Sequence, residues 1–370
     1  MMFLKYIPKK IDNFYMLSKS YFSKSPSYLI LFVTAMCNAR CKMCFYWKNI
    51  DNAQLKEELS LKEYEKISKK FKNLVYISIG GGEPTLRKDL PKIIKSFYDN
   101  SGTRYVNIVT NGGLPQQTLD MINDVFKRCP KINVKISISL DGFEDLHDEI
   151  RGIKGLFLKS IETYKLLSKI DNESFALNIA TTLSKLNKEQ IKEFVDYISD
   201  GLNINDHTIS FVRGDAKDEE SKEVTLKEYH DTWNYLLDKQ QNQAKGFFKI
   251  FNNMVRAMYS INQKTLEEDK MFVSCVAGNK LITLDEKGNV YPCEIISYLN
   301  KSRDFKMGSL RDSNYNINKI LKNKKSKNII SFIKKSKCHC GFECANLCNI
   351  AFSKKNLIKV IVFPKRFIGQ

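Results

Sequence analysis

The chain has 370 residues, of which 43% are hydrophobic and 27% are charged, and its formal net charge is +19. No apolar run reaches the roughly eighteen residues that span a bilayer, which argues against an integral membrane protein. Ten cysteines without a signal peptide are typical of metal ligands in a reducing compartment rather than of disulfides, so we expect a cytoplasmic protein. The length predicts one large domain with a smaller unit beside it.

Six short β-rich runs alternate with longer amphipathic segments between residues 29 and 213. Each intervening segment is long enough for a helix, which predicts β-α units with buried parallel strands. An open doubly wound sheet would give a similar string, so the pattern alone leaves the topology open. The six runs are residues 29–34, 75–79, 105–110, 134–140, 176–182 and 208–213.

Three cysteines follow the first of these runs: Cys37, Cys41 and Cys44. Three thiolates can bind three irons of a 4Fe-4S cube and leave the fourth iron without a protein ligand, whereas structural zinc sites normally close with four protein ligands. No fourth Cys or His lies near this loop, and a disulfide would leave one thiol over. An open-site cluster is therefore favoured over zinc and over a disulfide.

This loop resembles the CxxxCxxC motif of the radical S-adenosylmethionine (radical SAM) enzymes. The resemblance implies an α/β fold, a partial (β/α)6 TIM-like barrel over residues 29–220. In that family the open iron chelates the amino and carboxylate groups of SAM, and an electron from the cluster cleaves SAM to methionine and a 5'-deoxyadenosyl radical. The position before the last cysteine is often aromatic in the family and is Met43 here.

The second run ends in Gly80-Gly81-Gly82-Glu83-Pro84. By itself this is an ordinary Gly-Pro turn, with glycines that let a ligand approach the backbone closely. It also resembles the GGEP motif of the same family, and the two motifs together are far more specific than either one. The resemblance implies that Gly81, Gly82, Glu83 and Pro84 bind SAM, with the Glu83 carboxylate on its amino group.

Later strand ends add four polar candidates for the same site. Asn111 and Ser139 stand in Thr-Asn-Gly and Ser-Leu-Asp-Gly turns, and they resemble family positions that face the methionine or ribose of SAM. Arg151 ends a segment that resembles the family's HDxxR, and it either pairs with the SAM carboxylate or caps a helix. Arg213 closes the sixth run, from which it can reach the same pocket.

A second cysteine group follows residues 221–270, which we expect to form a helical linker. Cys275 and Cys293 flank a strand-turn-strand pattern with Gly288 at its turn, and such a hairpin brings its two ends together. Four closely spaced later cysteines could also build a zinc knuckle unaided. These are Cys338, Cys340, Cys344 and Cys348.

Together the two sets resemble the SPASM/Twitch extension, which implies a small auxiliary-cluster domain over residues 271–350. The later spacing departs from the full SPASM pattern, and six thiols are too few for two fully cysteine-ligated cubes. We therefore expect one auxiliary 4Fe-4S cluster held by Cys275 and Cys293, with Cys344 and then Cys340 as the foremost further ligands. A second cluster with a non-cysteine or open ligand is the alternative. Cys129 matches no motif and is expected to be structural.

The positive charge is concentrated in residues 301–337, which hold twelve Lys or Arg against two Asp, a net charge of +10. This stretch is either a solvated basic face or the site of an anionic partner. The basic N-terminal segment 1–28 and the tail 351–370 mix lysines with large apolar residues, so they either lie on a membrane surface or pack on the barrel. No nucleic-acid-binding module accompanies the charge, so nucleic acid is not expected.

The resemblance thus implies an enzyme that abstracts hydrogen from an unactivated carbon, with a reductant such as flavodoxin or ferredoxin. Relatives with the extension act on peptides, protein side chains and aminoglycoside-like sugars. Because 28 residues before the first strand are too few for a separate leader-recognition domain, we favour a polar, anionic carbohydrate or lipid-linked substrate over a peptide. A peptide- or protein-modifying maturase is the runner-up. A non-catalytic iron-sulfur protein and a zinc-stabilised nucleic-acid-binding protein are the alternatives from other classes.

Overall fold

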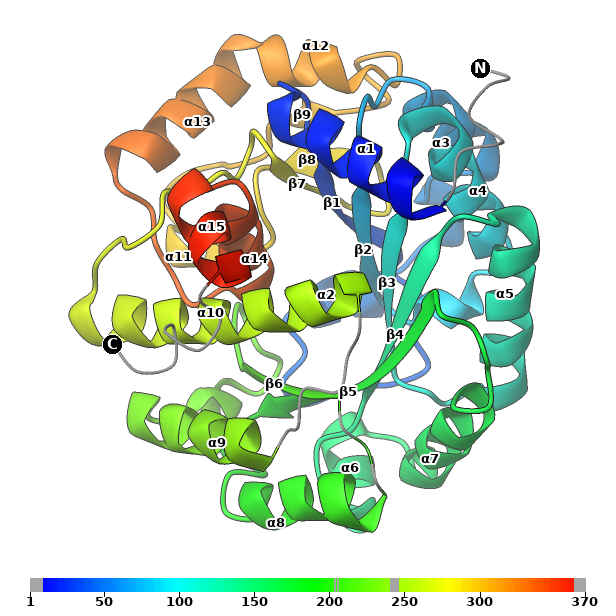
Figure 1. The fold of residues 1–370 in the computed structure, drawn as a ribbon, viewed down its shortest axis with the longest axis vertical. Helices are drawn as coiled ribbons and strands as arrows, with labels where there is room; N and C mark the ends of the chain where they lie inside the picture. The colour runs from blue at the N-terminus through cyan, green and yellow to red at the C-terminus, as the bar shows by residue number, and fades with distance from the viewer. Residues whose placement is uncertain (1–8, 203, 205, 240–245, 363–370) are drawn as a thin grey trace.

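The structure is a computed structural model that describes residues 9–202, 204, 206–239 and 246–362. Its strands form one sheet in the order β6-β5-β4-β3-β2-β1-β7-β8-β9 (Figure 1). The strands from β6 to β7 in this order run parallel, and β8 and β9 add antiparallel pairs. The bounds are β1 Tyr28–Thr34, β2 Tyr76–Gly81, β3 Tyr105–Thr110, β4 Asn133–Ser139, β5 Phe175–Leu183, β6 His207–Phe211, β7 Leu281–Leu284, β8 Asn289–Tyr291 and β9 Gly308–Ser309.

Helices cover the outer face of the six-strand arc, as Figure 1 shows. All seven residues of β1 are buried, which explains why this strand is a continuous apolar run rather than an alternating one. The six predicted β-α units are therefore confirmed, and the curved parallel sheet is the predicted partial barrel. The helices from β1 to the end of this arc are α2 Trp47–Asp51, α3 Leu61–Ser68, α4 Leu90–Ser101, α5 Pro115–Arg128, α6 Glu144–Arg151, α7 Leu156–Leu167, α8 Ile191–Asp196 and α9 Leu226–Lys239.

Residues 271–350 share a sheet with the barrel. The expected hairpin forms as β7 and β8, and β7 pairs with β1 in register from Tyr28 with Leu281 to Leu31 with Leu284. The first barrel strand therefore has neighbours on both sides, and the strands of the segment expected as a small auxiliary-cluster domain continue the barrel sheet. The remaining helices after β6 are α10 Gly246–Glu268, α11 Ile296–Leu299, α12 Ile317–Lys322, α13 Lys324–Lys335, α14 Glu343–Ala351 and α15 Lys354–Val362.

The described parts of both terminal segments pack on the rest of the molecule. Helix α1 (Lys9–Phe22) is held by a Nε–Oδ2 ion pair of 2.7 Å between Arg104 and the buried Asp12. The Lys280 ammonium donates to carbonyl oxygens at the end of α1, including that of Ser20 at 2.9 Å. Helix α15 packs against α10 and α14. The described part of the N-terminal segment thus packs on the barrel, which is one of the two predicted alternatives, whereas α15 packs on α10 and α14. None of the described helices is both long and apolar enough to cross a membrane.

Candidate functional site

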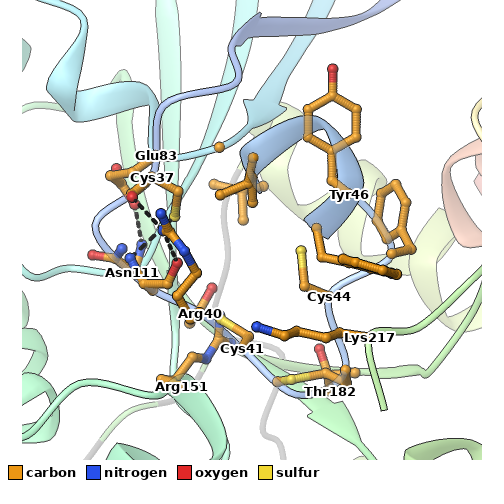
Figure 2. Close-up of a pocket in the computed structure, with 18 of the residues that line it drawn as sticks. Cys37, Arg40, Cys41, Cys44, Tyr46, Glu83, Asn111, Arg151, Thr182 and Lys217 are labelled. Atoms are coloured by element: carbon orange, nitrogen blue, oxygen red, sulfur yellow. Dashed lines mark hydrogen bonds between the residues drawn. The ribbon is translucent and has the colours of Figure 1, made fainter. Parts of the chain in front are cut away.

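A cavity of about 210 Å³ lies at the carboxyl ends of the parallel strands. Figure 2 shows Cys37, Cys41 and Cys44 around it, with Glu83 near Cys37 and Arg151 near Cys41. Active sites of barrel folds lie at this end of the strands. Of the residues predicted for SAM, all except Pro84 line this cavity; they are Gly81, Gly82, Glu83, Asn111, Ser139, Arg151 and Arg213.

The cysteine loop is held against the second strand by backbone hydrogen bonds. The Gly82 amide donates to the Thr34 carbonyl and the Glu83 amide to the Met36 carbonyl, both at 2.8 Å. A Cβ at position 82 would lie 2.2 Å from the Met36 oxygen, so a larger residue there would displace the backbone. We expected these glycines to admit a ligand; at Gly82 the group that approaches is the cysteine loop itself.

The end of α6 and the segment after β6 hold the loop from two further directions. The Arg40 amide donates to the Arg151 carbonyl at 3.0 Å, and the Lys42 amide donates to the Ile150 carbonyl at 2.9 Å. The Lys217 amide donates to the Cys44 carbonyl at 3.1 Å. The loop conformation is therefore set by residues far away in sequence.

The three thiols of the loop are partly buried and line the cavity. Burial raises the pKa of Cys37 and of Cys44 to about 12, so metal binding at these positions must release protons. In the described part of the chain, no three His, Cys, Asp or Glu side chains are arranged to hold one metal ion. Three thiols beside a cavity leave room for a ligand on the fourth iron.

Glu83 is a buried carboxylate held by four hydrogen bonds. It accepts from the Thr85 amide at 3.0 Å, from the Thr85 and Thr110 hydroxyls at 2.7 and 2.8 Å, and from the Asn111 amide at 2.7 Å. Burial raises its pKa, and these hydrogen bonds oppose the rise. An ammonium group entering the cavity would compensate this buried negative charge. The geometry therefore suits the role predicted for Glu83.

Asn111 joins the third strand end to the cysteine loop. Its side-chain amide donates to the Asn38 side-chain oxygen at 2.7 Å, while its own oxygen accepts from the Gly113 amide at 2.8 Å. Ser139 lines the cavity from the end of β4. Asn111 therefore orders the loop as well as lining the cavity.

Arg151 forms a buried ion pair that was not predicted from the sequence. Its Nε lies 2.5 Å from Oδ2 of Asp141, whose side chain is completely buried, and its Nη1 lies 3.7 Å from the Cys41 sulfur. The other Asp141 oxygen accepts from the Thr182 amide at 2.8 Å. Asp141 belongs to the Ser-Leu-Asp-Gly turn, so the signal was in the motif that identified Ser139. The guanidinium is thus oriented beside the cysteine loop.

The comparison with known protein families agrees with this geometry. Residues 31–198 match the radical SAM superfamily. The chain carries a radical SAM domain. It is a radical SAM enzyme, and its cofactors are SAM and a 4Fe-4S cluster, as the cysteine motif implied.

Three curated relatives resemble this radical SAM enzyme at 25% identity. The AdoMet-dependent heme synthase of Methanosarcina barkeri aligns over 290 residues, 75% of this chain and 79% of the relative. The sporulation killing factor maturation protein SkfB of Bacillus subtilis aligns over 222 residues, 56% of this chain and half of the relative. The cysteine-type anaerobic sulfatase-maturating enzyme of Clostridium novyi aligns over 299 residues, 73% and 74% of the two chains.

Two solved structures share the fold of this radical SAM enzyme. Native anSMEcpe with bound AdoMet superposes with a TM-score of 0.58 at 17% identity, covering 93% of this chain and 98% of that one. SuiB of Streptococcus suis superposes with a TM-score of 0.56 at 18% identity, covering 87% and 72%. At this identity the likeness concerns the fold.

The six later cysteines of the radical SAM enzyme lie in one region. Cys275, Cys293, Cys338 and Cys340 form one set, and Cys344 and Cys348 form a second set that adjoins the first at Cys275. Cys275 and Cys338 share a hydrogen bond, which lowers the pKa of Cys275 to about 7. Burial raises the pKa of Cys293, and the charges of the nearby Cys340 and Cys275 raise it further. Cys344 instead hydrogen-bonds with Tyr28 at the start of β1, and Cys348 neighbours both Cys344 and Cys275.

Buried asparagines tie the two cysteine segments together. The Asn346 side chain donates to the Cys340 carbonyl at 2.7 Å and to the Asn262 side chain at 2.6 Å. The Asn349 side-chain oxygen accepts from the Val276 amide, beside Cys275, at 2.8 Å. These contacts hold both segments in place, and no spacing in the sequence signals them.

Arg213 joins the cavity to the later cysteines. Its guanidinium forms an ion pair with Glu343, lies 3.4 Å from Oε1 of Glu294, and stacks on Phe342 at 4.8 Å from the ring centroid. Both carboxylates are largely buried, and each adjoins a cysteine in sequence, Cys293 or Cys344. The prediction that Arg213 binds SAM stays a prediction, because the observed partners are these two glutamates.

Proposed function

We propose that this radical SAM enzyme abstracts a hydrogen atom from an unactivated carbon of a peptide or protein side chain. The observation that carries its chemistry is the convergence of Cys37, Cys41, Cys44 and Glu83 on one cavity at the strand ends. When bound, the cluster supplies the electron that cleaves SAM, and SAM supplies the 5'-deoxyadenosyl radical. The residues of the chain hold, orient and enclose these groups.

Each residue that lines the cavity has a distinct task in this proposal. The three cysteines hold the cluster, and the buried Glu83 carboxylate binds the amino group of SAM. Arg151, oriented by Asp141, holds the Cys41 side of the loop in place. Asn111 and Ser139 present polar groups to the methionine or ribose part of SAM, and Gly81, Gly82 and Pro84 shape the loop that carries Glu83.

Two of the three named relatives support a peptide or protein substrate, and the third is a heme synthase. SkfB is a maturation protein, and the Clostridium novyi relative is a sulfatase-maturating enzyme. The carbohydrate or lipid-linked substrate that we favoured from the sequence has no counterpart among the relatives described above. The runner-up from the sequence, a maturase, is therefore the better supported of the two.

The later cysteines would hold one auxiliary 4Fe-4S cluster in this proposal. Cys275 and Cys293 are two ligands, and the other four thiols supply the rest. A group held there can accept an electron from the substrate, which makes the net reaction an oxidation, or relay an electron to the SAM site. Arg213 is the side chain that lies between this region and the cavity.

Anaerobic reconstitution with iron and sulfide tests the radical chemistry. After reduction with dithionite in the presence of SAM, 5'-deoxyadenosine should form well above a Cys41→Ala control. A protein that as purified contains zinc and no labile sulfide, or that forms no more 5'-deoxyadenosine than the control, would contradict the proposal.

A mass-spectrometric assay tests the substrate class. Peptides encoded by neighbouring genes are incubated with the reduced enzyme and SAM, and we expect a mass change in a peptide that requires both. If a saccharide or lipid-linked saccharide is consumed and every peptide is unchanged, the peptide substrate is contradicted and the carbohydrate substrate is supported.

A further inference from the structure

The outer side of α12 and α13 is a basic face with no large apolar side chain. Helix α13 buries Ser326, Ile329 and Ile333 and turns its lysines outward. None of the exposed large hydrophobic side chains in the described residues falls within 301–337. We call the exposed lysines between residues 319 and 337 that have no ion pair among the described residues the α13 face; they are Lys319, Lys322, Lys324, Lys327, Lys334, Lys335 and Lys337.

The charge of the α13 face is almost uncompensated within the described chain. On α13 only Lys325 has an ion pair, with Asp304 at 2.6 Å, and Arg311 nearby pairs with Glu63 at 2.8 Å. The lysines of the α13 face have no carboxylate partner among the described residues. Like charges a helical turn apart repel each other, so an acidic partner would lower the energy of this face.

The α13 face leads directly into the later cysteines. Helix α13 ends at Lys335, Lys337 adopts the left-handed conformation with φ 50°, and the Cys338 amide donates back to the Ile333 carbonyl at 3.0 Å. Cys338 and Cys340 are only partly buried. In Figure 1 both helices lie along the rim beyond β7, β8 and β9, on the other side of the molecule from α5 and α7. The basic face and the accessible edge of the cysteine group are therefore continuous.

We propose that the α13 face docks an acidic one-electron carrier protein, whose reduced flavin or iron-sulfur centre delivers its electron across the Cys338–Cys340 edge. The inference rests on the proposed function, which requires an electron for each SAM cleavage. The carrier loses one electron, and the centre held by the later cysteines gains it and passes it on to the cluster held by Cys37, Cys41 and Cys44; no bond between heavy atoms forms or breaks in this transfer. The positive charge of the α13 face favours an acidic partner. Because this face adjoins the Cys338 and Cys340 thiols, we infer that the acidic partner is an electron carrier.

An anionic membrane fits the same charge less well. A helix that lies in a lipid interface buries large apolar side chains beneath its lysines. The exposed residues of α13 besides lysine are Asn328 and Ser331. The membrane is therefore an outcome for the test and not the proposal.

The test compares reduction of the reconstituted enzyme by flavodoxin hydroquinone and by dithionite. The variant combines Lys324→Glu, Lys327→Glu, Lys334→Glu and Lys335→Glu. A matched variant makes the same change in charge on the far side of the molecule, at exposed lysines without an ion pair among the described residues; it combines Lys127→Glu, Lys159→Glu, Lys165→Glu and Lys169→Glu. Stopped-flow bleaching of the cluster absorbance measures the electron transfer without any substrate.

We expect the α13 variant to slow reduction by flavodoxin by about tenfold or more at low salt, with less than about a twofold effect in the matched variant. Reduction by dithionite should be unchanged in both variants, which shows that folding and clusters are intact. Added salt should slow the wild type toward the α13 variant, because surface charges are screened.

Two results would overturn the docking proposal. The first is equal slowing in both variants, which indicates a general charge effect, and the second is unchanged reduction of the α13 variant by flavodoxin. If unchanged reduction is accompanied by loss of binding to phosphatidylglycerol vesicles, the face is assigned to a membrane. Failure of wild-type enzyme to form 5'-deoxyadenosine with dithionite would instead contradict the proposed function, so the two failures are distinguishable.

Discussion

At the scale of single residues, the site depends on buried charges whose partners are distant in sequence. Glu83 is predicted from its motif, and its hydrogen bonds from Thr110 and Asn111 explain how a carboxylate is kept in the interior. The ion pair of Arg151 with Asp141 needs the fold, because nine residues of turn and helix separate them. Motif residues can thus be predicted from the sequence, whereas the partners that orient them are much harder to predict.

The charge of Glu83 should determine the affinity for SAM. Glu83→Gln keeps the volume and part of the hydrogen bonding but removes the negative charge that faces the SAM ammonium. We expect the dissociation constant for SAM to rise by about tenfold or more, as for loss of a charged hydrogen bond. Anaerobic equilibrium dialysis measures it, with iron content as the control for an intact cluster. Unchanged SAM affinity would show that the amino group binds elsewhere.

Arg213 should be a major contributor to stability. Arg213→Met leaves Glu294 and Glu343 largely buried without their cation, which costs about 3–5 kcal/mol in the free energy of unfolding. Denaturant unfolding measures this loss, and adding Glu294→Gln and Glu343→Gln should recover part of it. A stability equal to wild type in the single variant would mean that the ion pairs contribute nothing net.

At the scale of elements, the six parallel strands follow directly from their apolar runs, but the position of the hairpin does not. Strand pairing needs an exposed edge, and β1 offers one because the barrel is incomplete. The pairing of Tyr28 with Leu281 depends on the tertiary structure, and no local sequence pattern predicts it. The cysteine loop is similar: its spacing is local, and its conformation depends on contacts from β2, α6 and the segment after β6.

The glycine next to Glu83 should be required by the cysteine loop. Gly82→Ala places a Cβ against the Met36 carbonyl and must move the loop, so we expect iron and labile sulfide in the reconstituted protein to fall by about half or more. Gly80→Ala is the matched control, since a Cβ there meets nothing nearer than 4.0 Å. Equal iron content in the two variants would refute this account of the motif.

At the scale of the whole molecule, one sheet joins the SAM site to the later cysteines. Strand β1 carries the cysteine loop at its carboxyl end, and Tyr28 at its other end hydrogen-bonds with Cys344. Arg213 makes the second connection, between the cavity and the glutamates beside Cys293 and Cys344. The two sites are therefore joined by packed, buried groups.

The buried His147 should make the free energy of unfolding of the whole protein fall in mild acid. Burial lowers the pKa of His147 to about 4, below the value near 6.5 of an unfolded histidine. Between these values the unfolded chain holds more protons than the folded one, so the free energy of unfolding falls as pH falls.

His147→Gln should reduce the loss of stability between pH 7 and 5 by about 2 kcal/mol. Denaturant unfolding of the iron-free protein measures it, so that acid release of the cluster does not contribute. His339→Gln is the control, because hydrogen bonding to the Lys337 carbonyl raises the pKa of His339 and its loss should not flatten the dependence. An unchanged slope in His147→Gln would contradict the prediction.

The sequence by itself determined the chemistry: the spacing of Cys37, Cys41 and Cys44, the Glu83 motif and the six strands are local patterns, because ligand spacing and strand periodicity are set by neighbouring residues. Only the tertiary structure decided which residues contact the residues of these motifs and strands. The pairing of β7 with β1, the Asp141 partner of Arg151 and the glutamates around Arg213 join residues that are distant along the chain or held by a fold. Burial makes such contacts strong, since a charge removed from water must find its partner wherever the chain brings one.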